Sequence, residues 1–252
     1  MDTHFYYMAV NLGCVGVPFI FSFHPKLNFF KNWKALLVGT IAMMALFIPW
    51  DIYFTANGIW SFNPKYVTGK FIYGLPIEEW LFFICIPYAC VFTYSCMKLF
   101  LPKNFSSKFL TALLYATCFT FLIVAATHTE RWYTFAAHLL SGLFLALHLF
   151  IFKTRYLATF MLTFLIILVP FLASNGILTG VTFWDYSFIN FDVDNITEKI
   201  VSYNNEHNLR LRLFSMPIDD IAYGMLMLLL TTTVYEKVLS SIRKPSSSAI
   251  AK

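Results

Sequence analysis

Seven long apolar stretches run along the chain, and short segments rich in polar and charged residues separate them. Each stretch has about the 20 residues that an α-helix needs to cross the hydrocarbon core of a bilayer. The pattern therefore predicts an all-α integral membrane protein with seven transmembrane helices. The predicted spans are residues 4–22, 35–54, 76–97, 109–127, 132–152, 156–178 and 214–236.

The composition excludes the main soluble classes. Hydrophobic residues make up 59% of the chain and charged residues 12%, which is about half the charged fraction of a soluble domain. A disordered chain would need low hydrophobicity. The 5 cysteines lie in apolar stretches, without a Cys-x-x-Cys pair or a histidine at metal-ligand spacing, so the sequence predicts neither a disulfide framework nor a metal site.

The charged residues are divided between the two sides of the predicted bundle. The net charge is +5, but two thirds of the lysines and arginines lie on one side, in the 23–34, 98–108 and 153–155 loops and the C-terminal segment. By the positive-inside rule that side is cytoplasmic. We therefore expect a multi-pass protein of the cell (inner) membrane, with its N-terminus outside, its C-terminus cytoplasmic and no nucleic-acid partner. All acidic residues except Glu236 lie on the outer side.

Two outer segments, residues 47–80 and 168–221, share an order of motifs. Each has a Pro-aromatic pair near the end of an apolar stretch, then Asn-Gly, a loop, and Pro-Ile followed by two acids. Helices four apart cross the membrane in the same direction, so the pattern predicts a parallel 3+1+3 internal repeat. The predicted parts are a three-helix repeat in 1–104, a linking helix in 105–130, a second three-helix repeat in 131–240 and a disordered cytoplasmic tail in 241–252.

The doubled motif supplies the candidate catalytic acids, Glu78, Glu79, Asp219 and Asp220. The preceding prolines suit the first turn of a helix. Carboxylates there complement the helix dipole, which is one interpretation of both pairs. However, each pair runs directly into apolar sequence, and ionisable groups at membrane depth are functional candidates. Adjacent helical residues point about 100° apart, so we expect one acid of each pair, Glu78 and Asp219, to face a shared cavity.

Crowded carboxyls suit acid–base chemistry. Burial and like-charge neighbours favour the neutral form, so one carboxyl of such a cluster can hold a proton while another acts as a base. In an apolar cavity the acid could protonate an alkene, and the neighbouring carboxylate could later remove a proton.

Three segments carry a specific resemblance. Pro-Ile-Glu-Glu-Trp-Leu-Phe-Phe (76–83), Asn-Gly-Ile-Leu-Thr-Gly (175–180) and Met-Pro-Ile-Asp-Asp-Ile-Ala-Tyr-Gly (216–224) resemble the membrane-integral lycopene cyclase family. Its members are two small three-helix subunits in some bacteria and fused chains in others and in fungi, and this chain looks like the fused form over nearly all its length. The family motif is Pro-x-Glu-Glu/Asp in each half. The second half departs from it, because Asp219 stands where Glu is usual and has a shorter reach.

The resemblance implies a lycopene β-cyclase of carotenoid biosynthesis, an isomerase of the intramolecular lyase type. Such an enzyme adds a proton to a linear ψ end group of lycopene, closes a β-ionone ring and releases a proton, giving γ-carotene and then β-carotene. No cofactor is implied, and the chain has no Gly-x-Gly-x-x-Gly after a strand. The expected partners are lycopene and other linear carotenoids in the bilayer and membrane lipid, with homo-oligomerisation left open.

Further residues near the motifs are candidates for supporting roles. Aromatic faces can stabilise a carbocation, although Trp and Tyr also concentrate at membrane interfaces. Asp51, beside Trp50 near the outer end of the second predicted span, is a candidate supporting acid that binds substrate or stabilises the cation. Two arginines either orient the second acid pair or pair with loop acids, and Asn175 is a further supporting candidate. The aromatic candidates are Trp50, Trp60, Trp80, Phe82, Phe83 and Tyr223, and the two arginines are Arg210 and Arg212.

Two other functions fit parts of the pattern. A related membrane terpenoid cyclase would use the same chemistry on another polyene. A 3+1+3 transporter would place polar groups at mid-membrane, whereas these acids cluster towards one face. The sequence leaves open the ring type, the number of ends closed, and which carboxyl is acid and which is base.

Overall fold

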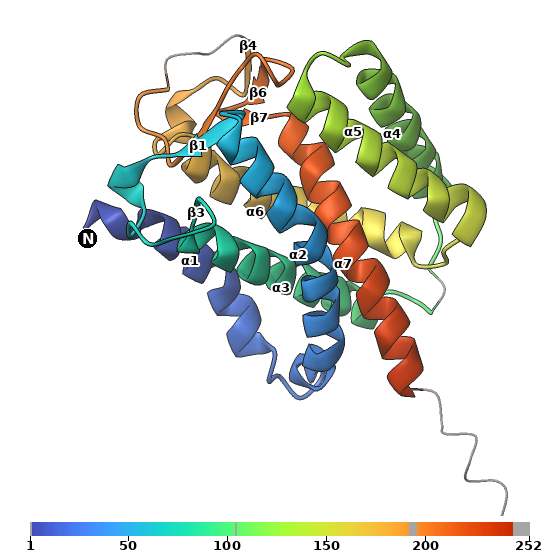
Figure 1. The fold of residues 1–252 in the computed structure, drawn as a ribbon. Coiled ribbons are helices and arrows are strands. Elements are labelled where there is room, and N and C mark those ends of the chain that lie inside the picture. The colour runs from blue at the N-terminus through green and yellow to red at the C-terminus, as the bar shows by residue number, and fades with distance from the viewer. Residues whose placement is uncertain (1, 104, 192–195, 244–252) are drawn as a thin grey trace, which may run out of the picture.

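The computed structural model describes residues 2–103, 105–191 and 196–243, and seven long helices dominate them (Figure 1). Each of these helices, taken with the short helical turns that adjoin some of them, is long and apolar enough to cross a membrane. The predicted all-α integral membrane class is therefore confirmed. The helices are α1 (Tyr6–Phe21), α2 (Trp33–Ala56), α3 (Ile77–Phe100), α4 (Lys108–Thr127), α5 (Trp132–Ala146), α6 (Leu157–Thr179) and α7 (Asp219–Arg243).

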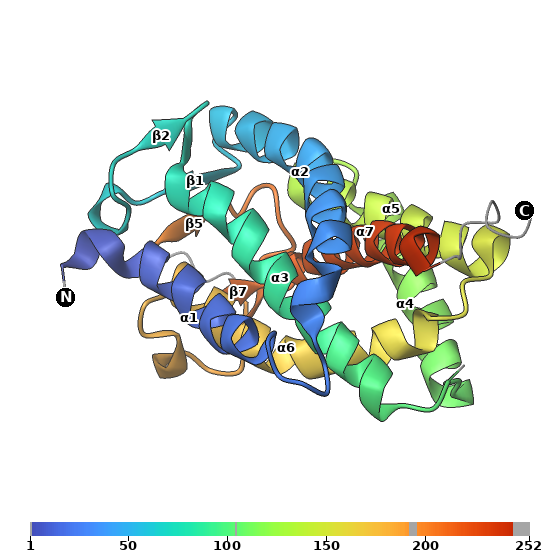
Figure 2. The ribbon, with the colours of Figure 1, turned by 90° about the horizontal axis from the view of Figure 1, so that it is seen from below.

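Helix α7 lies at the centre of the bundle and contacts α2, α3 and α5, while α1 and α6 pack on α3 (Figure 2). The approach of α2 to α7 is close, because a Cβ on Gly39 would lie 2.8 Å from the carbonyl oxygen of Thr231. Large apolar side chains such as Ile20, Phe150 and Val169 are exposed on the outside of the bundle. Such a surface is expected where the surrounding solvent is lipid.

Two helices, α3 and α7, begin directly after short strands that the sequence did not predict. The last helix begins at Asp219 rather than at 214, because the preceding residues form the strands β6 (Leu211–Leu213) and β7 (Met216–Pro217). Pro76 likewise lies in strand β3 (Leu75–Pro76), with extended backbone angles. The prediction that both prolines occupy first helical turns is therefore wrong: each proline ends a short strand that delivers the chain to the helix.

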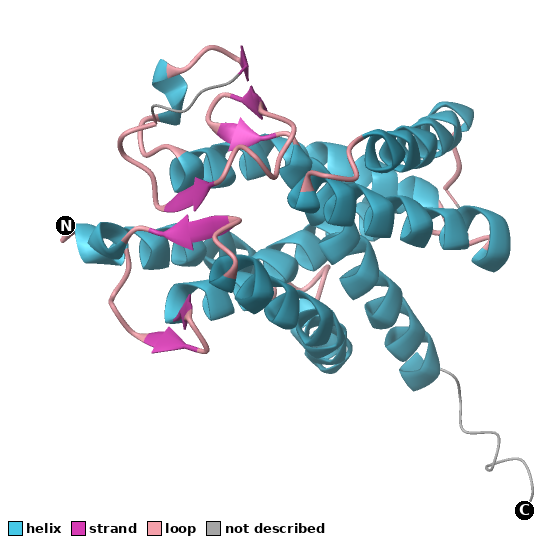
Figure 3. Cartoon of the chain, turned by 45° about the horizontal axis from the view of Figure 1, so that its top comes forward, coloured by secondary structure: helices cyan, strands magenta, loops and turns pink. Residues whose placement is uncertain are grey.

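Short strands form most of the cover over the end of the bundle where α3 and α7 begin (Figure 3). Strand β1 (Trp60–Phe62) pairs antiparallel with β5 (Val201–Tyr203), and β4 (Ile189–Phe191) pairs with β6. Strand β2 (Phe71–Ile72) pairs with β3. The β1–β5 pair joins the loop before α3 to the loop before α7, so it holds together the two segments that carry the acid motifs. Helical turns complete the described elements: η1 (Thr3–Phe5), η2 (Phe29–Asn32), η3 (Pro64–Tyr66), the π-helical η4 (Leu147–Phe152) and η5 (Phe183–Asp185).

The same two loops are joined by an exposed ion pair. Lys65 Nζ lies 2.9 Å from Glu198 Oε2, and the hydroxyl of Tyr66 donates to the same carboxylate. These hydrogen bonds, first that of Tyr66 and then that of Lys65, hold the pKa of Glu198 below its ordinary value of 4.5. A carboxyl whose pKa is lowered by folding stabilises the folded state at pH values above its unfolded pKa. This stabilisation is lost as the pH falls through the folded pKa.

We therefore expect Glu198→Gln to lower the melting temperature of the detergent-solubilised protein slightly near neutral pH. The difference from wild type should shrink as the pH falls through the lowered pKa of Glu198, because the wild-type carboxylate then becomes protonated as well. Thermal unfolding over a series of pH values from neutral to acid checks this. A difference that persists unchanged in acid would show that the ion pair does not join the loops.

The 3+1+3 repeat and its boundaries stay predictions, and one of the motifs behind them is not equivalent in the two halves. Asn57 and Gly58 follow the end of α2, and Gly58 has a positive φ of 67°. Asn175 and Gly176 instead lie inside α6 and are buried. Helix α7 also continues to Arg243, past the predicted tail boundary at 241, and the rest of the predicted tail lies outside the described residues.

Candidate active site

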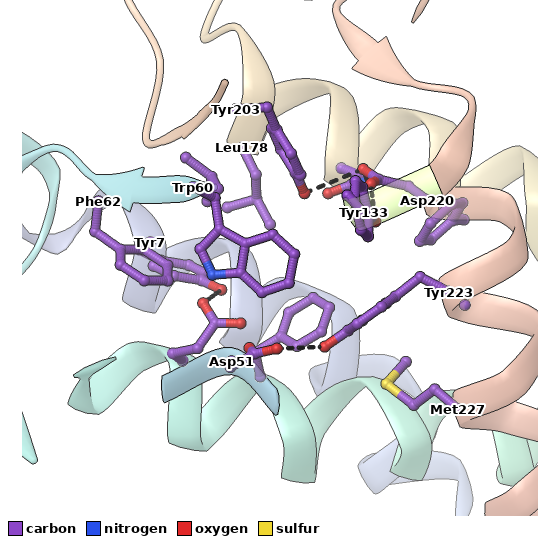
Figure 4. A pocket seen from close by; sticks show the side chains of 16 residues that line it. Tyr7, Asp51, Trp60, Phe62, Tyr133, Leu178, Tyr203, Asp220, Tyr223 and Met227 are labelled. Atoms are coloured by element: carbon purple, nitrogen blue, oxygen red, sulfur yellow. Dashed lines mark hydrogen bonds between the residues drawn. The ribbon is translucent and has the colours of Figure 1, made fainter. Parts of the chain in front are cut away.

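A buried cavity lies beneath the β1–β5 pair, between the ends of six helices (Figure 4). Its volume is about 50 Å³. Three carboxyl groups reach it, those of Asp51 from α2, Glu79 from α3 and Asp220 from α7, and all three are buried. The remaining walls are mostly aromatic and apolar: Tyr7, Trp60, Phe62, Phe82, Tyr133, Phe171, Asn175, Leu178, Val201, Tyr203, Tyr223, Gly224 and Met227.

Asp51 and Glu79 form one carboxyl pair on one side of the cavity. Both carboxyl groups are buried and lie near enough to interact with each other. The hydroxyl of Tyr7 on α1 donates to Glu79 Oε2 at 2.5 Å, and the hydroxyl of Tyr223 on α7 donates to Asp51 Oδ1 at 2.8 Å. A carboxylate can only accept hydrogen bonds. Two neighbouring buried carboxyls disfavour full ionisation, so this pair is suited to hold one proton.

Asp220 has a different environment, in which every hydrogen-bond partner is a donor. The hydroxyl of Tyr133 donates to Oδ1 at 2.5 Å, the amide of Asn175 to Oδ2 at 2.5 Å and the hydroxyl of Tyr203 to Oδ2 at 3.3 Å. Burial, and then the charge of Asp220, raise the pKa of Tyr203 well above its ordinary value, so this phenol remains a neutral donor. Three donors and no carboxyl hydrogen-bond partner suit an ionised Asp220.

The structure corrects the expectation that Glu78 and Asp219 face the cavity. Glu78 Oε1 accepts from the backbone N–H of Thr68 at 2.9 Å. Asp219 Oδ2 accepts from the backbone N–H of Leu209 at 3.1 Å, and Oδ1 accepts from Thr134. The first acid of each motif thus binds the loop that folds over its helix, which leaves the second acid to point inward.

A comparison with known families identifies the chain. The lycopene cyclase family model matches residues 4–97 and 129–238. The chain belongs to the lycopene cyclase family.

Two fungal proteins are among the individual relatives of the chain. The bifunctional lycopene cyclase/phytoene synthase of Podospora anserina is 31% identical over 103 residues, which is 40% of this chain and 16% of that protein. The protein of the same name from Phycomyces blakesleeanus is 31% identical over 106 residues, 42% of this chain and 17% of that protein. The chain therefore matches less than a fifth of the length of these relatives. No solved structure matches the chain.

Only some of the aromatic residues predicted from the sequence line the cavity. Trp60, Phe82 and Tyr223 do. Trp50 lies behind them and contacts Tyr223 edge-on, with ring centroids 5.3 Å apart. Phe83 packs on Phe47 and on Phe82, away from the lining.

Trp80 and the two predicted arginines form hydrogen bonds to backbone carbonyls of the loops. The indole N–H of Trp80 donates to the carbonyl of Ile72 at 3.3 Å. Arg212 is buried and donates to the carbonyl of Ser215 at 2.7 Å, and Arg210 donates to the carbonyl of Asn205 at 3.2 Å. Arg212 is also near enough to Asp220 to interact with its charge. Asn175 does reach the site, because it donates directly to Asp220.

Three tyrosines of the site, Tyr7, Tyr133 and Tyr203, were not predicted from the sequence. Tyr7 lies near the start of α1 and binds Glu79, and Tyr133 lies near the start of α5 and binds Asp220. Helices α1 and α5 are equivalent in the predicted repeat, so a comparison of their starts could have paired these two tyrosines. The β1–β5 pairing places Tyr203 at the cavity, and no pattern in the sequence indicates that position.

Proposed function

We propose that the chain is a lycopene β-cyclase, which converts the linear ψ end groups of lycopene to β-ionone rings without any net redox change. The observation that carries the proposal is the cavity itself, in which three buried carboxyls face an otherwise aromatic and apolar lining. Buried ionisable groups are costly and mark functional sites in membrane proteins. The family membership supplies the class of substrate.

The reaction needs one proton to enter and one to leave. The proton adds to the terminal double bond of the end group, whose electron pair forms the new C–H bond and leaves a tertiary cation. The electron pair of a double bond further along the chain then closes a six-membered ring and moves the positive charge into it. Loss of a proton from the ring carbon that formed the new bond leaves the ring double bond of a β-ionone. Atoms and electrons balance, so the overall reaction is an isomerisation.

The surroundings of the carboxyls support a division of roles between them. Asp51 and Glu79 are neighbouring buried carboxyls, so the pair retains one proton and is the general acid. Asp220, held by three donors, is the carboxylate that accepts the departing proton. Glu78 and Asp219 are positioning residues, because they fix the loops that close the cavity.

The aromatic lining suits the cationic intermediate. Trp60 lies between the two carboxyl networks, with its ring centroid 5.3 Å from that of Tyr133 and 6.1 Å from that of Tyr223 (Figure 4). The faces of such rings attract a cation within about 6 Å. The buried setting also keeps out water, which would otherwise trap the cation as an alcohol.

The charge distribution supports a placement in the cell (inner) membrane with the cavity near the outer surface and the C-terminus in the cytoplasm. Lycopene dissolves in the bilayer, so the substrate reaches the protein from the lipid.

The experiment that tests the function is pigment analysis of lycopene-accumulating bacterial cells that express this chain alone. We expect β-carotene, with γ-carotene as the one-ring intermediate, separated by chromatography from ε-ring and γ-ring isomers. Membrane insertion is verified in the same cells. Unchanged lycopene beside well-inserted protein would reject the proposal and favour a terpenoid cyclase that acts on another polyene, and an ε-ring product would reject the β assignment.

A further inference from the structure

A second, apolar cavity of about 240 Å³ lies between α1, α3 and α6, and we call it the α1–α3–α6 groove. Its walls include Cys14 of α1, Ala89 and Cys90 of α3, and Pro170 of α6. Pro170 is exposed on the outside of the bundle, so the groove opens towards lipid. Pro170 lies inside α6, where proline removes a helical hydrogen bond.

The groove adjoins the catalytic cavity. Phe171 lines both spaces, so its ring is the partition between them. Farther along α3 the groove leads to a narrow cleft at Tyr94, with which it shares Cys90 and Ile167 as walls. From Glu79 to Tyr94 the helix rises about 22 Å, so these spaces follow much of the roughly 30 Å hydrocarbon core.

We propose that the α1–α3–α6 groove binds the linear polyene arm of the substrate while one end group occupies the catalytic cavity, with Phe171 as the gate between them. The inference rests on the proposed function. Only an end group reacts, and the cavity of about 50 Å³ is smaller than the roughly 150 Å³ that holds a benzene ring, so the end group enters only when the Phe171 ring moves aside. The rigid arm must leave the cavity, and the groove is apolar, open to lipid and separated from the site by Phe171.

The first test fills the groove. Ala89→Phe is expected to lower the initial rate of lycopene cyclisation in proteoliposomes about tenfold or more, because overpacking removes the space for the arm. Ala116→Phe makes the same change on the exposed face of α4 and should leave the rate unchanged. An Ala89→Phe protein that inserts normally and cyclises lycopene at the wild-type rate would overturn the inference.

The second test keeps the groove intact and uses its cysteine. Cys14 lines the groove, whereas Cys96 lines a separate cavity nearer the C-terminal end of α3, and both are half-buried. In the Asp220→Asn variant, expected to bind lycopene without turning it over, saturating lycopene should slow labelling of Cys14 by an apolar maleimide severalfold and leave Cys96 unchanged. Mass spectrometry of the two peptides measures both rates.

The outcomes separate this inference from the proposed function. If wild-type protein makes β-carotene but lycopene does not protect Cys14, the arm lies elsewhere and the groove holds lipid chains, while the function stands. If well-inserted wild-type protein leaves lycopene unchanged, the function itself fails.

Discussion

Glu79→Gln and Asp220→Asn, each made alone, are expected to lower the rate of lycopene cyclisation by roughly 100- to 10,000-fold, the range that a positioned acid or base contributes. Each amide keeps the size of the carboxyl and most of its hydrogen bonds. Neither amide can deliver or accept the proton that the reaction needs. Purified protein in proteoliposomes with chromatographic analysis of the carotenoids measures the rates.

The matched controls are Glu78→Gln and Asp219→Asn, which make the same chemical change one residue earlier in each motif. Their carboxyls do not face the cavity; they accept hydrogen bonds from the backbone N–H groups of Thr68 and Leu209. We expect these variants to lose about 1 kcal/mol of stability, the value of a typical buried hydrogen bond, and to retain most of their activity once folded. If the controls lose cyclisation and Glu79→Gln and Asp220→Asn keep it, the assignment of the inward acids is reversed.

Asp51→Asn is expected to lower the rate of lycopene cyclisation roughly 100-fold, which is the second large effect. The substitution leaves room for hydrogen bonds to Glu79 and Tyr223 but removes the proton that the two carboxyls share. Asp51→Glu should restore part of the rate, because a carboxyl is again present at a slightly different reach. If Asp51 only positions Glu79, Asn should work about as well as Asp, and near-wild-type activity of Asp51→Asn would contradict a role in the acid.

Tyr223→Phe removes a hydrogen bond to Asp51 and leaves the Asp51 carboxyl in place. Its hydroxyl donates to Asp51 at 2.8 Å, and a hydrogen bond to a charged group is worth about 1.5–3 kcal/mol. The variant should therefore be slower by about tenfold or more, yet remain measurably active. Tyr115→Phe, on α4 where the ring packs against Phe150, is the matched control and should behave as wild type.

The sequence and the structure agree on the membrane helices because a helix that crosses lipid needs a long apolar stretch, and this is a local property of the chain. The starts of the helices were less predictable. Residues 214–217 are apolar enough to continue a span, but they form strand β7 and the turn before it, where Phe214 takes a positive φ of 54°. Pairing with β6 decides their conformation, and apolarity alone cannot distinguish such a strand from a helix end.

The sequence predicted which types of residue form the candidate site. It did not predict how their side chains are arranged. The doubled Pro-Ile-acid-acid motif indicated four candidate acids, but adjacent residues at a helix start point in different directions, and the rotation of the helix selects between them. That rotation depends on contacts distant in sequence: Tyr7 binds Glu79 across 72 positions, and Tyr133 binds Asp220 across 87. The predicted choice of Glu78 and Asp219 was therefore open to error.

The sequence by itself determined that this is a membrane protein of seven apolar helices, that acids gather at one face and that the lycopene cyclase motifs occur in both halves. Each of these follows from residue type and spacing along the chain. Only the tertiary structure decided that Asp51, Glu79 and Asp220 share one cavity, that Tyr7, Tyr133 and Tyr203 hold two of them, and that Phe171 separates this cavity from a lipid-facing groove. The physical reason is that helix packing and the β1–β5 pairing bring together side chains that no local pattern connects.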